Sequence, residues 1–178
     1  PDIVQSYEVS EDNKIFTFHL RKGLKWSDGT PVTTEDVQFA YEDILLNDEL
    51  TPVFPKELTA GGEPCEVEIV DTYTFEVKFA ESYGGFLGLL GRRMMGYGWF
   101  LQPKHYLKQF HPKYTSLEEL EPLIREAGFE KEQWWNLFNR KTDPYMGDIG
   151  CPVLSPWVMV EYNAQTGTIR YERNPFYY

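Results

Sequence analysis

Hydrophobic and polar residues alternate with a period of two along four short segments in the first half of the chain. Phe16, Phe18 and Leu20, for example, alternate with Thr17 and His19. The alternating segments are 3–9, 16–20, 65–69 and 75–79, separated within each pair by turn residues at 11–13 and 71–72. Such a pattern predicts β-hairpins with one face on a core and one in water, which is typical of antiparallel sheets.

A helical period follows the first hairpin. Thr33 is an N-cap candidate, and Asp36 three residues later resembles the acidic partner of a capping box. The apolar positions after it recur at intervals of three and four residues: Val37, Ala40, Tyr41, Ile44 and Leu45. This spacing places one apolar stripe on a helix, which we expect over 34–46.

Shorter patterns fill the rest of the chain. They predict helices at 82–90, 103–110, 116–127 and 131–139, a loop at 47–64 with a helical turn near 55–58, and strands at 157–162 and 168–173. Pro122 could kink the third of these helices. Hairpins followed by several helices and then strands do not alternate as βαβ units. We therefore expect an α+β fold in which residues 1–178 form a single sub-domain.

Composition excludes some partners. The formal net charge of −11 argues against nucleic acid and against anionic membrane surfaces. No apolar run approaches the 18 residues of a membrane-spanning helix. Aromatic residues make up 16% of the chain, which suits either an irregular core or a ligand-handling protein.

Catalytic motifs do not emerge from the sequence. Two cysteines, Cys65 and Cys151, form no disulfide framework and leave the redox compartment open. The three histidines lack metal-ligand spacing, and there is no nucleotide-binding or hydrolase signature. Asp143 and Asp148 could be imagined as a glycosidase pair, but sequence spacing does not give their separation. We expect no enzyme activity, no catalytic residue, no metal and no cofactor.

The segment 16–37 carries a specific likeness. Its sequence, FTFHLRKGLKWSDGTPVTTEDV, closely resembles the family 5 solute-binding proteins, which include peptide-, nickel- and oligosaccharide-binding proteins of ABC importers. Weaker matches lie at 6–10, 71–77, 101–105 and 172–178, so the likeness runs nearly end to end. The motif itself is structural: Gly23 permits a turn, Trp26 can anchor it, and Asp28-Gly29 can close a second turn.

The resemblance implies a function for a longer protein. Family members are several times longer and close two lobes around a ligand. This chain resembles part of the first lobe, so we expect a fragment that contributes one wall of a cleft for oligopeptides or related small solutes. It also implies an extracytoplasmic location, periplasmic or as a cell-surface lipoprotein, and a membrane permease as partner. The alternative is an oligosaccharide-binding module or a piece of a carbohydrate-active enzyme.

Five residues are candidates for ligand contact. Met95, Tyr97 and Trp99 correspond in order to a family loop that can face the cleft, although Tyr97 and Trp99 could equally pack in the core of the lobe. Phe54 and Trp157 are secondary candidates. The segment 151–157 lacks the glycines common in the family, and this departure would suit an unusual ligand if the segment lines the pocket.

Overall fold

The computed structural model describes residues 3–91, 97–143, 149–163 and 165–177, without the side chain of Tyr97. Residue contacts divide the chain into two compact units. Unit 1 comprises Pro1–Leu24 and Val32–Gln102, and unit 2 comprises Lys25–Pro31 and Pro103–Tyr178. The chain therefore passes between the units three times. A single sub-domain over 1–178 would require the two units to fold together, and it stays a prediction.

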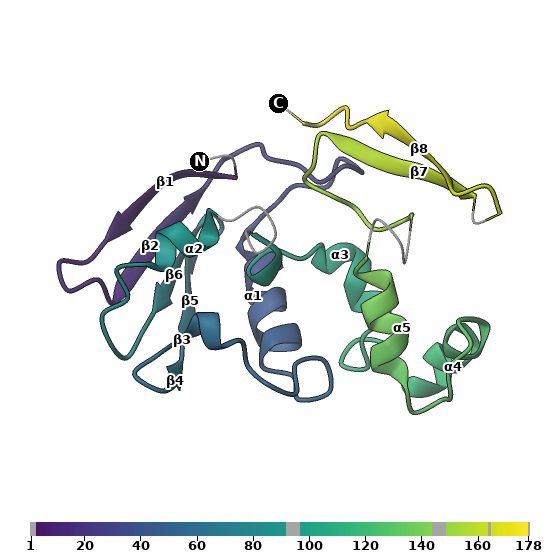
Figure 1. Cartoon of the computed structure of the whole chain (residues 1–178), viewed down its shortest axis with the longest axis horizontal. Coiled ribbons are helices and arrows are strands. Elements are labelled where there is room, and N and C mark those ends of the chain that lie inside the picture. Colours follow the sequence, from purple (N-terminus) through teal and green to yellow (C-terminus); the bar gives the residue numbers. More distant parts are fainter. Residues whose placement is uncertain (1–2, 92–96, 144–148, 164, 178) are drawn as a thin grey trace. The chain divides into compact units, whose positions relative to one another are not determined.

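Unit 1 is built on an antiparallel sheet of four strands in the order β1-β2-β6-β5 (Figure 1). The strands are β1 Val4–Val9, β2 Ile15–Leu20, β5 Glu66–Asp71 and β6 Thr74–Lys78. Both predicted hairpins are confirmed, and β2 joins them by pairing with β6. Phe18 lies opposite Phe75 and Phe16 opposite Val77, and all four side chains are buried. The alternation therefore has one covered face, as the sequence predicts.

Aromatic rings cover that face of the sheet. The ring centroid of Phe86 in α2 (Phe86–Leu90) lies 4.9 Å from that of Phe16 and 4.8 Å from that of Phe79, both edge-on. This geometry is the favourable one for aromatic pairs. The helix begins four residues later than the predicted 82–90. Gly84 and Gly85 stand in the missing part, and glycine is costly inside a helix.

Helix α1 (Thr34–Phe39) begins where the sequence predicts. The Thr33 side chain accepts a hydrogen bond from the Glu35 amide in the first turn of the helix. The Thr33 amide donates to Asp36 Oδ2 at 3.1 Å, which completes the capping box. The second half of the predicted helix is a π-helix, η1 (Ala40–Leu45), with wider turns. A wider turn changes which positions face inward, and the polar Asp43 is buried beside the predicted stripe.

The loop at 47–64 contains three short elements. They are η2 Lys56–Leu58, β3 Thr59–Ala60 and β4 Glu63–Pro64. The helical turn is confirmed, whereas the two-residue ladder between β3 and β4 was not predicted. Gly61 and Gly62, both at positive φ, supply the tight turn between them.

Unit 2 holds the polar helices. They are α3 Lys104–Leu107, its 3₁₀ continuation η4 Lys108–Phe110, α4 Leu117–Glu126 and α5 Trp134–Lys141. Leu120 and Ile124 of α4 are fully buried, but Leu117, predicted on the same apolar line, is exposed. Pro122 lies inside α4 without ending it. Helix α5 starts later than the predicted 131–139, and Trp134 and Phe138 are its buried anchors.

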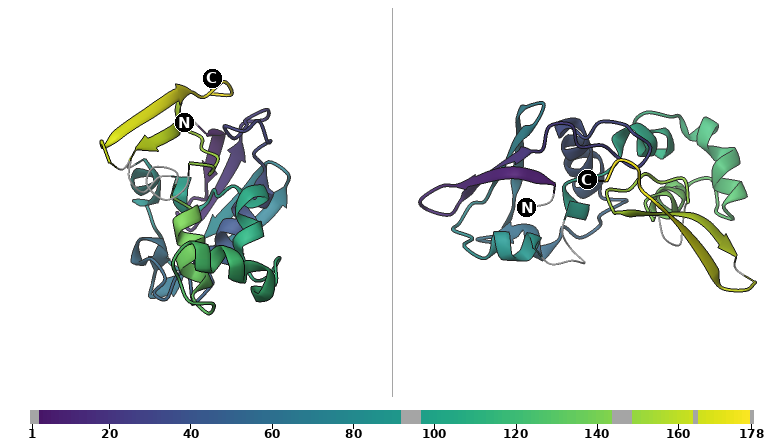
Figure 2. Two further views of the ribbon diagram at one scale, coloured as in Figure 1. Left: turned by 90° about the vertical axis from the view of Figure 1, so that its right-hand side faces the viewer. Right: turned by 90° about the horizontal axis from the view of Figure 1, so that it is seen from above.

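The last element of unit 2 is a two-stranded hairpin, β7 (Trp157–Asn163) with β8 (Thr168–Arg173), as predicted. Figure 2 shows it in yellow as a long ribbon. Together with the sheet of unit 1 and the short helices, it confirms the α+β class. Within the described ranges, no helix has the length and hydrophobicity needed to cross a membrane.

Candidate functional site

The segment around η3 (Tyr97–Trp99) carries the main ligand candidates. Met95 lies outside the described residues, and so does the side chain of Tyr97. Trp99 closes η3 and is half-buried, while Gly98 before it is exposed. Trp99 is thus the one candidate of this segment whose side chain can be assessed.

Residues after Trp99 fix the segment to unit 1. Phe100 and Leu101 are each only 4% exposed, and the Phe100 ring meets Phe86 edge-on at 6.2 Å. The Gln102 side-chain amide donates to the Gly98 carbonyl oxygen at 2.8 Å. These contacts hold the backbone of η3, so the exposed part of the Trp99 ring is presented from a fixed position. Such a ring can stack on a sugar or pack against an apolar side chain.

Phe54 lies in a loop of unit 1 that is ordered by polar contacts. The Asn47 side-chain oxygen accepts from the amides of Glu49 and Leu50 at 2.9 and 3.2 Å. The Thr51 hydroxyl donates to the Ile44 carbonyl oxygen at 2.7 Å. Phe54 itself is half-buried. Its ring therefore contributes to the packing of unit 1 while keeping some surface free.

Trp157 opens β7 in unit 2 and is 57% exposed. The backbone around it is held by Asn174, a buried polar residue whose side-chain amide donates to the Ser155 carbonyl oxygen at 3.0 Å. The Asn174 backbone amide also donates to the Pro156 carbonyl oxygen at 2.9 Å. Asn174 thereby gives the Arg-Asn-Pro segment a structural role at the start of β7.

The candidates that the structure describes are divided between the two units. Trp99 and Phe54 belong to unit 1 and Trp157 belongs to unit 2. Each is a separate candidate position, and its role in ligand contact stays a prediction.

The turn 25–31 is the part of the family-like motif that belongs to unit 2. Trp26 is 1% exposed, so it anchors the turn as predicted. Gly29 has φ +89°, and its amide donates to the Trp26 carbonyl oxygen at 2.9 Å. The Ser27 amide donates to the Val153 carbonyl oxygen, and the Val153 amide donates to the Ser27 hydroxyl oxygen, both at 3.0 Å. The turn is therefore fastened to a loop that lies 126 residues further along the chain.

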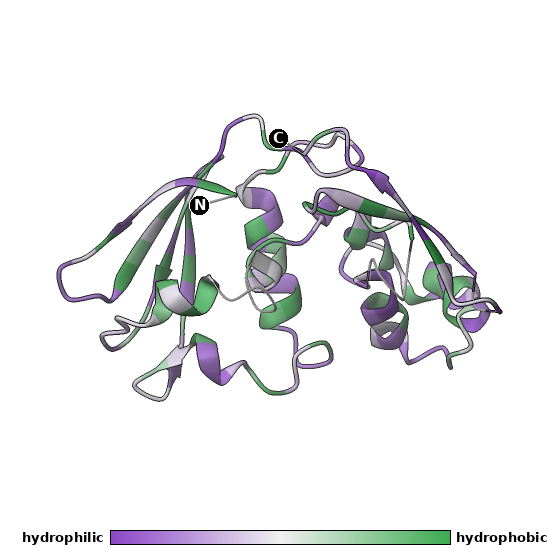
Figure 3. Ribbon diagram, turned by 45° about the horizontal axis from the view of Figure 1, so that its top comes forward, coloured by the Kyte–Doolittle hydropathy of each residue, from purple (hydrophilic) through white to green (hydrophobic). Residues whose placement is uncertain are grey.

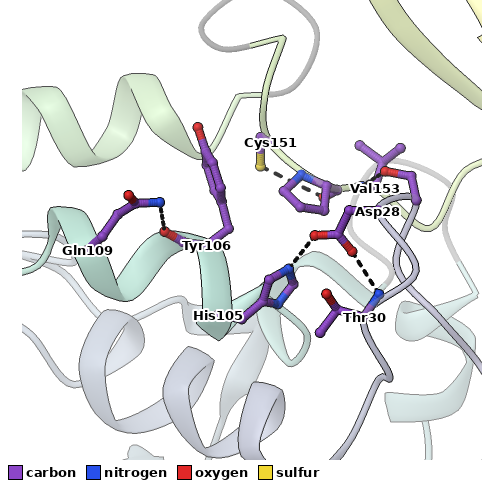
Figure 4. A network of polar contacts seen from close by, with 9 residues as sticks. Asp28, Thr30, His105, Tyr106, Gln109, Cys151 and Val153 are labelled. Carbon is purple, nitrogen blue, oxygen red and sulfur yellow. Dashed lines mark hydrogen bonds and ion pairs between the residues drawn. The ribbon is translucent and has the colours of Figure 1, made fainter.

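A contact between two side chains fastens the same turn to α3. His105 Nε2 lies 2.7 Å from Asp28 Oδ2, and the Thr30 amide donates to Asp28 Oδ1 at 2.9 Å (Figure 4). Partial burial by itself raises the pKa of Asp28, but the hydrogen bonds from Thr30 and His105 outweigh it and hold the pKa below its usual value. Sequence reasoning missed this pair because the two residues are 77 positions apart.

The cysteines and the acidic residues are the remaining groups with potential chemistry. Cys65 and Cys151 are both buried, and burial raises the pKa of the Cys65 thiol to about 12. A thiol with that pKa is a poor nucleophile at neutral pH. Asp148, one half of the imagined glycosidase pair, lies outside the described residues. Over the described part of the chain, no three His, Cys, Asp or Glu side chains form a group that could hold a metal ion.

The family is decided by a match over the whole chain. The model of the bacterial extracellular solute-binding proteins, family 5 Middle, matches residues 1–178. The chain belongs to this family. Its turn at 25–31, capped helix α1 and Asn174 segment are thus local structures within a family 5 protein.

The names of two curated relatives give different ligands. The chain is 33% identical over its full length to the periplasmic alpha-galactoside-binding protein of Rhizobium meliloti, and covers 22% of that protein. It is 30% identical over 75% of its length to the periplasmic oligopeptide-binding protein OppA of Salmonella typhimurium, and covers 26% of that protein. The chain therefore spans about a quarter of the length of these relatives.

Two solved structures match nearly the whole chain. An oligopeptide-binding protein OppA matches the whole chain with 40% identity and a TM-score of 0.84, and the chain covers 26% of it. The periplasmic binding protein MelB of Agrobacterium fabrum C58, solved in complex with stachyose, matches 99% of the chain with 31% identity and a TM-score of 0.68. The chain covers 23% of MelB.

Proposed function

We propose that this chain is part of the substrate-binding component of an ABC importer and contributes one wall of a cleft that binds oligopeptides. The observation that carries the proposal is the match to an oligopeptide-binding protein over the entire chain, at 40% identity and a TM-score of 0.84. Because the chain covers only 26% of that structure, we further propose that residues 1–178 belong to a protein about four times as long. That longer protein is called the parent protein below.

Within the parent protein we propose that the segment Met95–Trp99 faces the ligand, with Phe54 and Trp157 as secondary contacts. The half-buried Trp99 supports this role, because its backbone is held while part of its ring is free. We propose no catalysis, since the matched relatives carry the names of binding proteins and transport requires the ligand to leave unchanged.

Calorimetric titration of the parent protein with a mixture of short peptides tests this function. Saturable binding without cleavage of the peptides supports transport, and released hydrolysis products would overturn it. We expect Trp99→Ala to raise Kd at least about tenfold, because aromatic residues dominate binding surfaces. Trp135→Ala is the matched control: Trp135 is also half-buried, but it lies on α5 in the other unit. Its Kd should stay within about twofold of the original value.

An oligosaccharide is the second candidate ligand. The alpha-galactoside-binding relative matches the full chain, and the stachyose-bound structure matches nearly all of it. Titration of the same preparation with stachyose separates the candidates. Tight binding of stachyose with no response to peptides would replace the peptide proposal with this one.

Location and partner follow from the same proposal. Relatives named as periplasmic binding proteins support an extracytoplasmic location for the parent protein. We propose that it delivers its ligand to a membrane permease. Attachment to the cell surface as a lipoprotein is a finer proposal, which mass spectrometry of the parent protein isolated from its host would test.

A further inference from the structure

Gly98 stands in the middle of η3 at a position where the backbone does not require glycine. Gly29 and Gly61 have φ angles of +89° and +68°, in the left-handed region that favours glycine. The φ angle of Gly98 lies outside that region. A residue with a side chain can therefore adopt the backbone conformation of Gly98.

Packing does not require glycine at this position either. A Cβ atom added to Gly29 would lie 2.9 Å from the ring of Phe176, and one added to Gly61 would lie 2.6 Å from Glu81. A Cβ atom added to Gly98 would have no heavy atom of the described residues within 4 Å, apart from its chain neighbours and the backbone of its own turn. Gly98 is also exposed. The space beside its Cα atom is therefore open.

Glycine in an ordinary turn conformation lowers stability. It has more conformational freedom in the unfolded chain than any other residue, so alanine at a compatible position stabilises the fold. A residue that goes against a local preference without a structural gain is expected at a functional site. Close approach of a ligand to the backbone is a use of glycine that fits this description.

The neighbours of Gly98 indicate which chemical group could approach it. Trp99 follows it in η3 and is half-buried. The segment is held, because η3 lies against η1 and the Gly98 carbonyl oxygen accepts from the Gln102 side chain at 2.8 Å. Part of an indole ring and a backbone without a Cβ atom are thus offered from a fixed position. Neither carries a charge, so they suit the face of an uncharged ring better than an ionised group.

We propose that Gly98 is a specificity-determining position, where the missing side chain lets a ring of the ligand lie flat on the backbone beside Trp99. This rests on the proposed function, in which the segment Met95–Trp99 faces the ligand. Phenylalanine, tyrosine or proline in a peptide can supply such a ring, and so can a pyranose unit of an oligosaccharide. The two sources share an uncharged ring face, and a methyl group at position 98 would keep either of them away.

Calorimetric titration of the parent protein and its Gly98→Ala variant tests the proposal. The titrants are stachyose and two mixtures of tetrapeptides, one rich in phenylalanine, tyrosine and proline and one made only of residues without rings. We expect Gly98→Ala to raise Kd for the ring-containing ligand at least about tenfold, because a methyl group forced into a close contact is costly. A smaller change overturns the proposal. An equal loss of affinity for the ring-free peptides also overturns it.

The ligand that responds identifies the source of the ring. A loss of affinity for the ring-rich peptides supports a peptide side chain at Gly98, and a loss for stachyose supports a pyranose unit there. Binding to the original protein that Gly98→Ala leaves unchanged would reject this inference alone. No binding of any titrant to the original protein would reject the proposed function, and the inference with it.

Gly88→Ala is the matched control. Gly88 lies in α2 of the same unit, is exposed, and also has open space where a Cβ atom would stand. Hydrophobic residues of α2 appear in green in Figure 3, and two of them, Phe86 and Leu89, are buried. Gly88→Ala should leave Kd within about twofold of the original value. Equal losses of affinity at the two glycines would contradict the role given to Gly98.

Thermal unfolding without ligand shows whether the space beside Gly98 is open in the parent protein. If it is open, Gly98→Ala and Gly88→Ala should both melt at the original temperature or slightly above it. A melting temperature that falls by several degrees for Gly98→Ala alone would mean that polypeptide fills the space, and would overturn the proposal.

A double-mutant cycle provides the last test. If one ring of the ligand contacts both Gly98 and Trp99, Trp99→Ala should cost less affinity in the Gly98→Ala background than in the original protein. Additive losses would mean that the two positions act on the ligand independently, and would overturn the shared contact.

Discussion

The sheet of unit 1 and the hairpin of unit 2 have the same kind of sequence pattern and different surroundings. In β2 and β6 the apolar positions are buried: Phe16, Phe18, Phe75 and Val77 are at most 4% exposed. In β7 and β8 the corresponding positions Tyr162, Ile169 and Tyr171 are exposed by about two fifths. Periodicity thus tells which face of a strand is apolar. It does not tell what lies on that face.

The largest expected change in the free energy of unfolding concerns Phe86, which packs on the sheet of unit 1. Phe86 is fully buried against five other rings, so Phe86→Ala should leave a cavity and lower the free energy of unfolding by about 3–5 kcal/mol. Urea unfolding monitored by circular dichroism measures it. Val53→Ala is the control, since Val53 is 84% exposed in the same unit and should change unfolding by less than about 0.5 kcal/mol. A small effect of Phe86→Ala would mean that the sheet face is not a tight core.

The Phe86→Ala variant also tests whether the two units unfold together. Trp99 is in unit 1, whereas Trp26, Trp134, Trp135 and Trp157 are in unit 2, so tryptophan fluorescence reports mainly on unit 2. If residues 1–178 form a single sub-domain, Phe86→Ala should lower the urea midpoint seen by fluorescence as much as that seen by circular dichroism. An unchanged fluorescence midpoint would instead mean that unit 2 unfolds independently.

Local contacts were predictable from the sequence and distant contacts were not. The Thr33–Asp36 capping box and the Trp26 anchor lie within a few residues of the motifs that revealed them. The bonds from Ser27 to Val153 and from Asp28 to His105 join residues 126 and 77 positions apart. A polar residue in a turn has many possible partners, so its own sequence neighbourhood does not select one. The ligand candidates share this difficulty, because a cleft is assembled from distant segments.

The N-caps of α1 and α4 allow a second comparison of the units, in which the expected loss of stability is smaller and the same for both. Thr33 caps α1 in unit 1 and Ser116 caps α4 in unit 2, each with a complete capping box. Thr33→Ala and Ser116→Ala should each lower the free energy of unfolding by about 1 kcal/mol. Thermal and urea unfolding of both variants measure the effect. Thr33→Ser and Ser116→Thr, which keep the hydroxyl, are the controls and should retain most of the stability.

A clear difference between the stability losses of Thr33→Ala and Ser116→Ala would show how burial affects a capping box. Asp36, the acidic partner of Thr33, is buried at 4% exposure, whereas the Ser116–Glu119 pair is exposed. If Thr33→Ala costs far more than Ser116→Ala, burial of the partner makes the difference. If Ser116→Ala costs as much as a core truncation, the Ser116–Glu119 pair does more for stability than an exposed cap normally does.

The smallest expected effect lies in the contact that fastens the turn 25–31 to α3. Asp28 and His105 are 40% and 30% exposed, so water screens their attraction, and Asp28→Asn should cost only about 0.5 kcal/mol at pH 7. The pKa of Asp28 is lowered in the folded chain, so its contribution is present above the unfolded pKa and is lost as pH falls through the folded pKa. The loss should therefore begin at about pH 5 and continue as pH falls below the usual Asp pKa of about 4.

Urea unfolding of the original chain and of Asp28→Asn across that pH range separates this contribution from the other carboxylates. Asp12 and Asp71 also have lowered pKa values, so both proteins lose stability in acid. The difference between them belongs to Asp28 and should shrink steadily as pH falls below about 4, because the protonated carboxyl no longer pairs with His105 as a carboxylate. A difference that persists unchanged at pH 3 would show that Asp28 acts through its hydrogen bond from Thr30 and the shape of the turn, and not through its charge.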